Sequence, residues 1–269
     1  MASSKKISLV QFRAEHNLLE NAETIVETPV SLTVNGSPWL TFMCTPVLLE
    51  EMAIGFLFNE GVIAGIDEVL DVRVCEHEDN IDIWLNRSVE RPNSWRRTSG
   101  CSGGVTAVDL YSEGLQPIPI QSEVVIPEQV NHLVGLLSDI QTLYRKTGGV
   151  HTSALSDGES IIFAADDIGR HNTLDKIAGW NLRFQPEINK KVLITTGRIS
   201  SEMLQKASRI RAEILVSRTS PSSLSIQLAD RVGITLIGYA RRNSFNVYTH
   251  PERIKSDVRY QIATKHGFT

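Results

Sequence analysis

The sequence predicts an α/β protein in which an α+β unit precedes a second domain built on a mixed sheet with flanking helices. The first half contains β-rich runs that come in pairs, which is typical of antiparallel hairpins. The second half alternates strand-like runs with amphipathic helical stretches, a pattern that favours parallel strands joined by crossover helices. An extended connection punctuated by Pro117, Pro119 and Pro127 separates the two patterns. We therefore expect two domains, residues 1–122 and residues 123–269.

The α+β unit is expected to hold four strands and one helix. Its strongest local signal is Asn35-Gly36, because both residue types tolerate the positive φ angles of a tight hairpin turn. Gly61 follows the helical stretch as a stop signal. The predicted strands cover residues 30–34, 39–43, 69–74 and 81–85, and the predicted helix covers residues 48–59.

The second domain is expected to begin with a helix and a hairpin. Apolar residues recur at helical spacing over residues 128–146, and Gly148-Gly149 ends that pattern. A hairpin around Asp157-Gly158 follows, with strands over residues 150–155 and 160–165. Beyond it, strands at 191–196, 214–217 and 234–239 alternate with helices at 173–180, 201–213 and 223–232.

Composition and charge exclude several classes of protein. The 269 residues carry a formal net charge of −4 and a pI of about 6.0, so no general affinity for nucleic acid or an anionic membrane is expected. Three cysteines, Cys44, Cys75 and Cys101, are too few and too scattered for a disulfide scaffold or a thiolate zinc site. No apolar run approaches a membrane span or the core of a signal peptide. We expect a cytoplasmic protein without a metal site.

Cys101 lies in the most unusual stretch of the chain. It sits among glycines and small hydroxyl residues, directly after Arg96-Arg97, where nothing can pack a core. Arginine charge and free backbone N–H groups favour the thiolate, which is the reactive form. The stretch therefore predicts nucleophilic or sulfur-carrying chemistry, and a flexible linker that happens to hold a cysteine is the alternative. Cys44 and Cys75 lie at strand ends, where we expect inert, buried thiols.

Arginines follow the strands predicted in the second domain. Ligands of an open α/β sheet bind outside the carboxyl ends of its strands. These ends carry Asp167, Arg170, His171, Arg198, Arg218, Arg241 and Arg242, interleaved with glycine and serine. In an acidic protein this pattern predicts a site for a phosphorylated, multiply anionic ligand. Under the alternative interpretation, the arginines only pair with carboxylates such as Asp166, Asp167 caps the following helix, and His171 satisfies a carbonyl.

Four motifs resemble those of a known family. They are Arg97-Thr98-Ser99-Gly100-Cys101, Thr147-Gly148-Gly149-Val150-His151, the stretch from Asp166-Asp167 to Asp175-Lys176, and Val247-Tyr248-Thr249-His250-Pro251. In this order, from about residue 27 to about residue 254, the chain resembles the FdhD family, the formate dehydrogenase accessory sulfurtransferases. Each motif is weak alone, and together they are specific. The resemblance implies a cytidine deaminase-like fold for the second domain.

The resemblance implies a sulfur carrier that works as a sulfurtransferase. A cysteine desulfurase would load a persulfide, and the sulfur would pass to bis(molybdopterin guanine dinucleotide)molybdenum before this cofactor enters formate dehydrogenase. By position, the carrier cysteine corresponds to Cys101. GDP is the expected surrogate ligand, and a homodimer is expected. The cofactor-contacting stretch corresponds to Tyr239, Ala240, Arg241, Arg242, Asn243 and Ser244.

Two departures from the family pattern affect the mechanism. Many members have a second cysteine three residues after the first, where this chain has Gly104, and some have another just before the histidine, where it has Gly149 and Val150. A persulfide can still be loaded and discharged at Cys101 alone. A non-catalytic chaperone for molybdenum cofactor or guanine nucleotide is the alternative. A deaminase-like hydrolase fits the implied fold but is disfavoured, because the zinc-binding Pro-Cys-x-x-Cys signature is absent.

Overall fold

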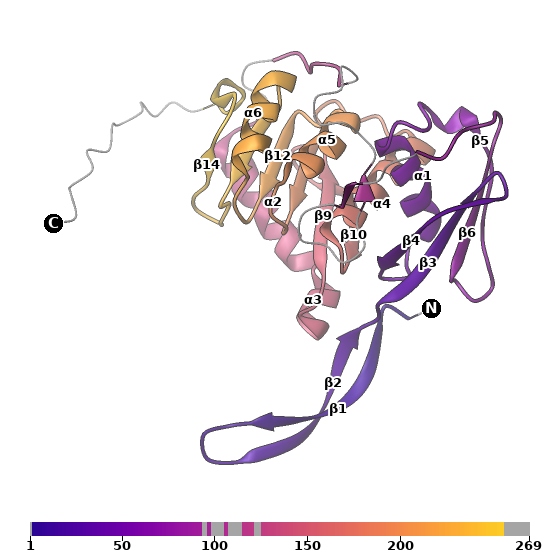
Figure 1. Ribbon diagram of the computed structural model, residues 1–269. Coiled ribbons are helices and arrows are strands. Elements are labelled where there is room, and N and C mark those ends of the chain that lie inside the picture. The colour runs from indigo at the N-terminus through magenta and orange to yellow at the C-terminus, as the bar shows by residue number, and fades with distance from the viewer. Residues whose placement is uncertain (1, 93–95, 98–104, 107–114, 121–124, 256–269) are drawn as a thin grey trace.

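The computed structural model describes residues 2–92, 96–97, 105–106, 115–120 and 125–255 (Figure 1). It contains a four-stranded sheet, a six-stranded sheet and two separate two-stranded pairs. The prediction of an α/β protein with a mixed sheet and flanking helices is confirmed. Among the described residues, no helix is both long and apolar enough to cross a membrane.

The four-stranded sheet forms around the predicted Asn35-Gly36 hairpin. These two residues have φ angles of 49° and 77°, the left-handed values that the turn requires. The strand order is β4-β3-β6-β5, and helix α1 packs Met52 and Phe56 onto the sheet beside Phe42. The elements are β3 (Thr28–Val34), β4 (Ser37–Cys44), α1 (Leu49–Asn59), the 3-10 turn η1 (Ile66–Glu68), β5 (Val69–Val74) and β6 (Asn80–Leu85).

The six-stranded sheet has the order β10-β9-β11-β12-β13-β14, with β11, β12 and β13 parallel to one another. Its helices follow the predicted alternation with strands. The strands are β9 (His151–Ser156), β10 (Ile161–Asp167), β11 (Val192–Thr195), β12 (Ile214–Ser217), β13 (Thr235–Gly238) and β14 (Asn246–Val247). The helices are α2 (Pro127–Ile140), α3 (Thr142–Thr147), α4 (Arg170–Phe184), α5 (Ser201–Arg209), α6 (Ser223–Val232) and the 3-10 turn η2 (Pro251–Arg253).

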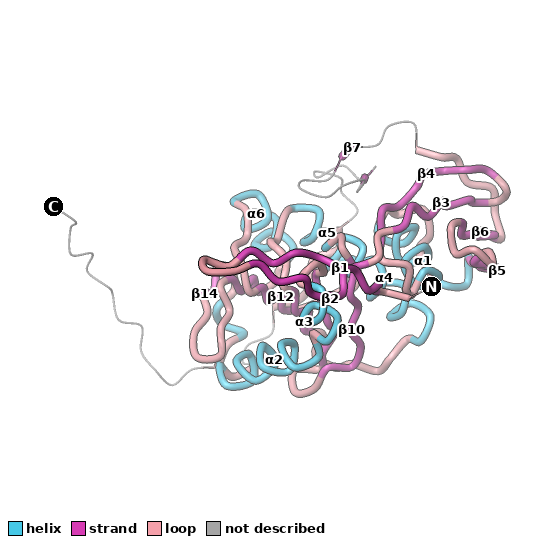
Figure 2. The backbone as a smooth tube through the Cα atoms, turned by 90° about the horizontal axis from the view of Figure 1, so that it is seen from below, coloured by secondary structure: helices cyan, strands magenta, loops and turns pink. Residues whose placement is uncertain are grey.

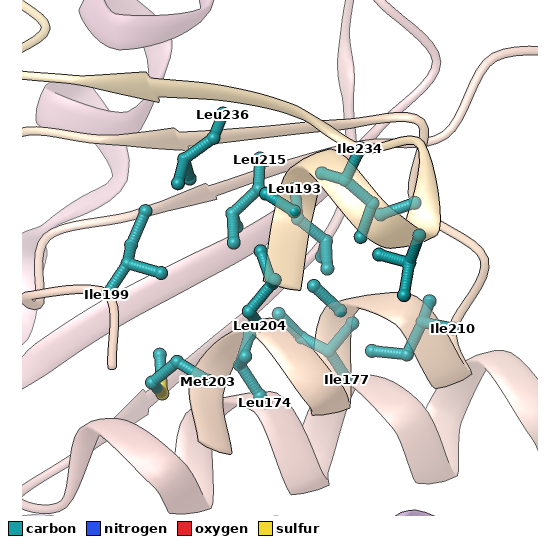
Figure 3. Packing of buried hydrophobic residues seen from close by; sticks show 14 of the residues in the cluster. Leu174, Ile177, Leu193, Ile199, Met203, Leu204, Ile210, Leu215, Ile234 and Leu236 are labelled. Carbon is teal, nitrogen blue, oxygen red and sulfur yellow. The ribbon is translucent and has the colours of Figure 1, made fainter. Parts of the chain in front are cut away.

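Helices cover both faces of this sheet. Successive residues of a strand point to opposite faces, so each strand contributes side chains to both buried clusters. Leu193 and Leu215 face α4, α5 and α6, and Leu204 of α5 belongs to the same buried cluster (Figure 3). Ile194 and Val216 belong to the cluster on the other face, under α2. For this reason the strands appear in the sequence as continuous apolar runs. Their buried backbone holds the connections at the sheet edge in position.

The helix predicted over residues 128–146 is wrong in one respect, because it breaks at Gln141. This residue has φ −71° and ψ 52°, outside the helical region, and it separates α2 from α3. Its buried side chain accepts a hydrogen bond from the Arg218 guanidinium and contacts the Thr152 hydroxyl. These long-range partners turn the side chain toward the sheet edge. Helix α5 also ends at Arg209, earlier than predicted.

A long two-stranded arm at the N-terminus has no counterpart among the predictions. Strands β1 (Ser4–Phe12) and β2 (Asn17–Ile25) pair antiparallel along their whole length. Figure 1 shows the arm extending past α3 and away from the body, and Figure 2 shows its strands running side by side. Large apolar side chains are exposed on it, with Phe12 78% and Leu19 79% exposed. Because neither face of the arm is fully buried, no apolar alternation marks it in the sequence.

Helices α1 and α4 pack so closely that they join the four-stranded sheet to the six-stranded sheet. A Cβ atom on Gly55 would lie 1.8 Å from the Asp175 carbonyl oxygen, and one on Gly179 would lie 1.9 Å from the Glu51 carbonyl oxygen. The two backbones therefore touch, and only glycine fits at either crossing point.

Replacing Gly55 by alanine is expected to lower the free energy of unfolding by at least about 2 kcal/mol, because backbone atoms cannot move aside as a flexible side chain can. Urea unfolding followed by circular dichroism would measure this change. Gly135→Ala is the matched control, because no atom lies within 4 Å of a Cβ placed there within α2. The control is expected to be neutral or slightly stabilising. Equal stability of the two variants would contradict the close crossing.

Candidate anion-binding site

The predicted strand-end stretches meet at one edge of the six-stranded sheet. Strand β9 is antiparallel to both β10 and β11, so the carboxyl ends of β10 to β13 point to the same edge, where β9 begins at His151. Three connections from this edge lead into helices: residues 167–170 into α4, residues 196–200 into α5 and residues 218–222 into α6. The predicted site stretches therefore lie together in space.

The described residues form two hollows at this edge. The first has a volume of about 470 Å³, and we call it the His151 hollow. Its walls come from the α2–α3 break, the start of β9 and the strand-end connections. The side chains that matter for binding are Gln141, Tyr144, His151, Thr196, Arg218 and Arg241. Tyr144 is 47% exposed, so an aromatic face is open to a ligand beside two guanidinium groups.

Hydrogen bonds orient both arginines of the His151 hollow. The Arg218 guanidinium donates to the Gln141 side-chain oxygen over 3.2 Å. The Arg241 guanidinium donates to the backbone carbonyls of Arg218 and Ala240. All these acceptors are neutral, so the two positive charges are held in place without being neutralised.

The second hollow has a volume of about 380 Å³, and we call it the Arg198 hollow. Arg170, Arg198 and three serines, Ser200, Ser220 and Ser222, line it. Gly197 lies between the two hollows. A Cβ atom there would lie 3.0 Å from Arg170 Cβ and 3.5 Å from His151 Nδ1. The hollows are therefore neighbours along the edge, divided by a backbone that leaves no room for a side chain.

No described carboxylate lies within 4 Å of the guanidinium groups of Arg198, Arg218 or Arg241. The alternative interpretation, in which the arginines only pair with carboxylates, therefore does not hold for these three within the described part of the chain. Arginine charges left without a carboxylate attract an anionic ligand. The edge of the sheet is thus locally cationic in a chain of net negative charge.

Asp167, a predicted site residue, is fully buried behind the hollows. One of its oxygens accepts from the Lys176 ammonium over 2.6 Å and from the Thr45 N–H over 3.1 Å. The other accepts from the Gly169 N–H and the Asn172 amide. With four donors on two oxygens, this carboxylate holds the start of α4 in position and does not line either hollow.

His171, also a predicted site residue, is 2% exposed in the first turn of α4. Its Nε2 atom lies 3.4 Å from the Ser200 hydroxyl. Burial, together with Lys206 and Arg170, holds the pKa of His171 well below its usual range. Burial and Arg170 also lower the pKa of His151. Both imidazoles are therefore neutral at pH 7, and His151 presents a neutral ring to the first hollow.

The predicted stretch from Tyr239 to Ser244 does not act as one surface. Arg241 enters the His151 hollow, whereas Arg242 and Asn243 line a separate hollow against α2. Ala240 is buried, and the Ser244 carbonyl accepts from the Arg241 N–H. Tyr239 is 48% exposed with a φ of 52°, and its N–H donates to the Thr219 carbonyl. A non-glycine residue whose backbone lies in the left-handed region is typical of functional sites.

Cys101 lies outside the described residues. The other two cysteines differ from each other. Cys44 is buried, and burial beside Asp167 raises its pKa to about 12. Cys75 is only half-buried, so the prediction of a buried thiol is wrong there. Its thiol donates to Asp79 and accepts from the Asn80 N–H in the turn after β5.

Four of the six side chains named in the His151 hollow were not predicted as site residues: Gln141, Tyr144, His151 and Thr196. His151 begins a strand antiparallel to its neighbour β11, so the rule about carboxyl ends did not point to it. Its place at the start of a strand, two residues after Gly149, was the signal that could have found it. Gln141 and Tyr144 lay inside a stretch expected to be one continuous helix, which carries no sign of a site.

The neutral state of His171 predicts a pH dependence of stability. The unfolded chain takes up a proton at this residue near pH 6.5, whereas the folded chain does not, so the free energy of unfolding should fall as the pH drops from 7.5 to about 5.5. His171→Asn should flatten this fall in urea titrations at several pH values. His77→Asn, in an exposed turn, is the control and should leave the slope unchanged. Identical slopes for all three proteins would contradict the assignment.

Comparison with known proteins supports one family. Residues 25–255 match the model of the FdhD/NarQ family. The chain is 34% identical over 254 residues to the sulfur carrier protein FdhD of Staphylococcus haemolyticus (strain JCSC1435), which covers 93% of this chain and 96% of that protein. It is also 34% identical over 259 residues to the sulfur carrier protein FdhD of Staphylococcus aureus (strain MRSA252), covering 93% and 98%.

A solved structure agrees with these sequence matches. The crystal structure of a formate dehydrogenase accessory protein from Desulfotalea psychrophila superposes with a TM-score of 0.79 and 29% sequence identity, covering 94% of this chain and 100% of that one. The family model covers most of the chain, both sheets included, and the match to the relatives extends over nearly their whole length. This chain therefore belongs to the FdhD/NarQ family.

Proposed function

We propose that this protein is a sulfur carrier that serves formate dehydrogenase. In this proposal it accepts sulfur from a cysteine desulfurase as a persulfide on Cys101. It then passes the sulfur to bis(molybdopterin guanine dinucleotide)molybdenum held at the arginine hollows. The names of the relatives supply the sulfur carrier and accessory roles. The observation that supports an anionic ligand is that Arg198, Arg218 and Arg241, at one sheet edge, have no carboxylate partner among the described residues.

The hollows suit the nucleotide part of that cofactor. Guanidinium groups bind phosphate oxygens through paired, charge-assisted hydrogen bonds. In the His151 hollow, Arg218 and Arg241 would hold the phosphates while the open face of Tyr144 contacts a purine ring. The neutral His151 imidazole can accept a hydrogen bond from the ligand without adding charge.

The sulfur chemistry rests on Cys101. Its thiolate attacks the outer sulfur of the desulfurase persulfide, forming a new S–S bond while the desulfurase thiolate leaves. The same outer sulfur is later handed on as neutral sulfur, which returns Cys101 to the thiolate, and the acceptor metal supplies the two electrons that make it a sulfide ligand. Cys44 cannot compete, because a pKa of about 12 leaves its thiol protonated at neutral pH.

A second candidate function uses the hollows without sulfur transfer. Gly104 stands where many family members have a second loop cysteine, and a chaperone that only binds cofactor or guanine nucleotide would need no cysteine at all. The two functions differ in their dependence on Cys101. The expected homodimer stays a prediction under either function.

Persulfide mapping separates these two functions. After incubation with a cysteine desulfurase and L-cysteine, peptide mass spectrometry should find a mass increase of one sulfur atom on the peptide with Cys101. Cys101→Ala should lose this increase and fail to restore formate dehydrogenase activity in cells that lack the native protein. Cys75→Ala is the matched control and should keep both. A Cys101→Ala protein that restores full activity would favour the chaperone.

Arg241 and Arg242 provide a second test, of the nucleotide site. Arg241→Ala should weaken GDP binding by about 10- to 100-fold, the loss expected for charge-assisted hydrogen bonds of roughly 1.5–3 kcal/mol. Arg242→Ala should weaken it much less, because Arg242 lines the separate hollow against α2. Isothermal titration calorimetry on both variants measures the difference. Equal losses would show that the ligand lies outside the His151 hollow.

A further inference from the structure

We infer that the N-terminal arm, formed by β1 and β2, docks into a groove beside β14 on a second copy of this chain. Residues 4–24 of the arm precede the stretch that matches the family model. The inference does not rest on the proposed function, because neither the arm nor this groove lines the His151 hollow or the Arg198 hollow.

One face of the outer half of the arm is apolar, exposed and free of charged residues. Val10 pairs with Leu19 across the two strands, so their side chains share a face with Phe12. These three residues are 52%, 79% and 78% exposed. Glu20 lies opposite Leu9 and therefore points to the other face. A two-stranded hairpin is only marginally stable alone in water, so this face calls for a covering surface.

A groove beside β14, which we call the β14 groove, matches this face in its chemistry. It has a volume of about 720 Å³, and none of the described residues that line it is charged. Strand β14 is the last of the six-stranded sheet, and its outer edge pairs with no described strand, so an extended segment can lie against it. Contact between the two surfaces would bury apolar side chains without desolvating a charge. The apolar and aromatic lining residues are Pro127, Phe245, Val247, Tyr248, Pro251 and Ile254.

The arm does not fill the β14 groove of its own chain. Its base packs near the start of β9, where a Cβ atom on Gly149 would lie 2.9 Å from the Ile25 side chain. Strands β11, β12 and β13 separate β9 from β14 in the sheet. From this base the arm extends past α3 and away from the body, whereas β14 forms the far edge of the sheet (Figure 1). An arm that fills the groove therefore comes from another molecule.

The area of contact favours a mutual exchange of arms between two copies. A pair of nine-residue strands measures about 30 Å by about 10 Å, so one of its faces covers about 300 Å². A single contact, whether arm on arm or arm in groove, buries about 600 Å² over both surfaces, half of the roughly 1,200 Å² of a small specific interface. Two reciprocal contacts reach that size. Only a second copy of this chain both gives an arm and receives one.

Analytical ultracentrifugation of the full chain tests the inference through the dissociation constant of the dimer. The wild-type protein should form a dimer of 29.9-kDa chains. Leu19→Glu on the arm and Val247→Glu in the groove should each raise the constant at least about 100-fold, because each buries an unpaired carboxylate. Leu70→Glu is the matched control, since Leu70 is 69% exposed on β5, and it should leave the constant unchanged. Circular dichroism verifies that each variant is folded.

Photo-crosslinking identifies the surface that the arm occupies. Isotope-labelled chains that carry a photoreactive amino acid in place of Phe12 are mixed with an excess of unlabelled wild-type chains, and mass spectrometry identifies the joined peptides. The joined peptides should combine a labelled arm with unlabelled residues 245–254.

A wild-type dimer that is weakened by both Leu19→Glu and Val247→Glu, and that is joined from arm to groove between copies, would support the inference. It would be overturned by a monomeric wild type, by a dissociation constant that either variant leaves unchanged, or by an arm joined to another arm or to its own labelled groove. GDP binding and persulfide formation are measured independently of these results, so failure here leaves the proposed function standing.

Discussion

The ion pair between Lys176 and Asp167 is the interaction on which the site depends. Both side chains are fully buried, and the ammonium donates to Asp167 and to the carbonyl oxygens of Thr45 and Asp166. Removing one partner of such a pair typically costs about 3–5 kcal/mol, since the remaining charge stays buried. This pair ties the end of β4 to the end of β10 and the start of α4. It thereby fixes where Arg170 enters the Arg198 hollow.

A second buried pair repeats this design at Asp175, the residue directly before Lys176 in α4. Asp175 accepts from the Lys206 ammonium and from the Asn59 amide, which links α4 to α5 and α1. Charged side chains thus hold the helices behind the site, while Arg198, Arg218 and Arg241 in front of it have no carboxylate partner among the described residues. The charges of the two ion pairs are buried, whereas Arg198 and Arg241 are exposed.

The sequence predicted those elements that are determined by residues close together in the chain. Asn35-Gly36 specifies its turn through its own φ angles, and the apolar runs of β11 and β12 reflect burial on both faces. The break at Gln141 was not predictable, because its partners Thr152 and Arg218 are distant in sequence. The arginines were found from their place after strands. Which of Arg241 and Arg242 enters the hollow depends on the course of the loop, and no property of two adjacent arginines reveals it.

The connections after β10, β11 and β12 each contribute residues to both hollows. A shift in the backbone of residues 196–200 or residues 218–222 therefore changes the shape of both hollows at once. Whatever alters the conformational equilibrium of one hollow alters that of the other, and by reciprocity the coupling free energy is the same in both directions.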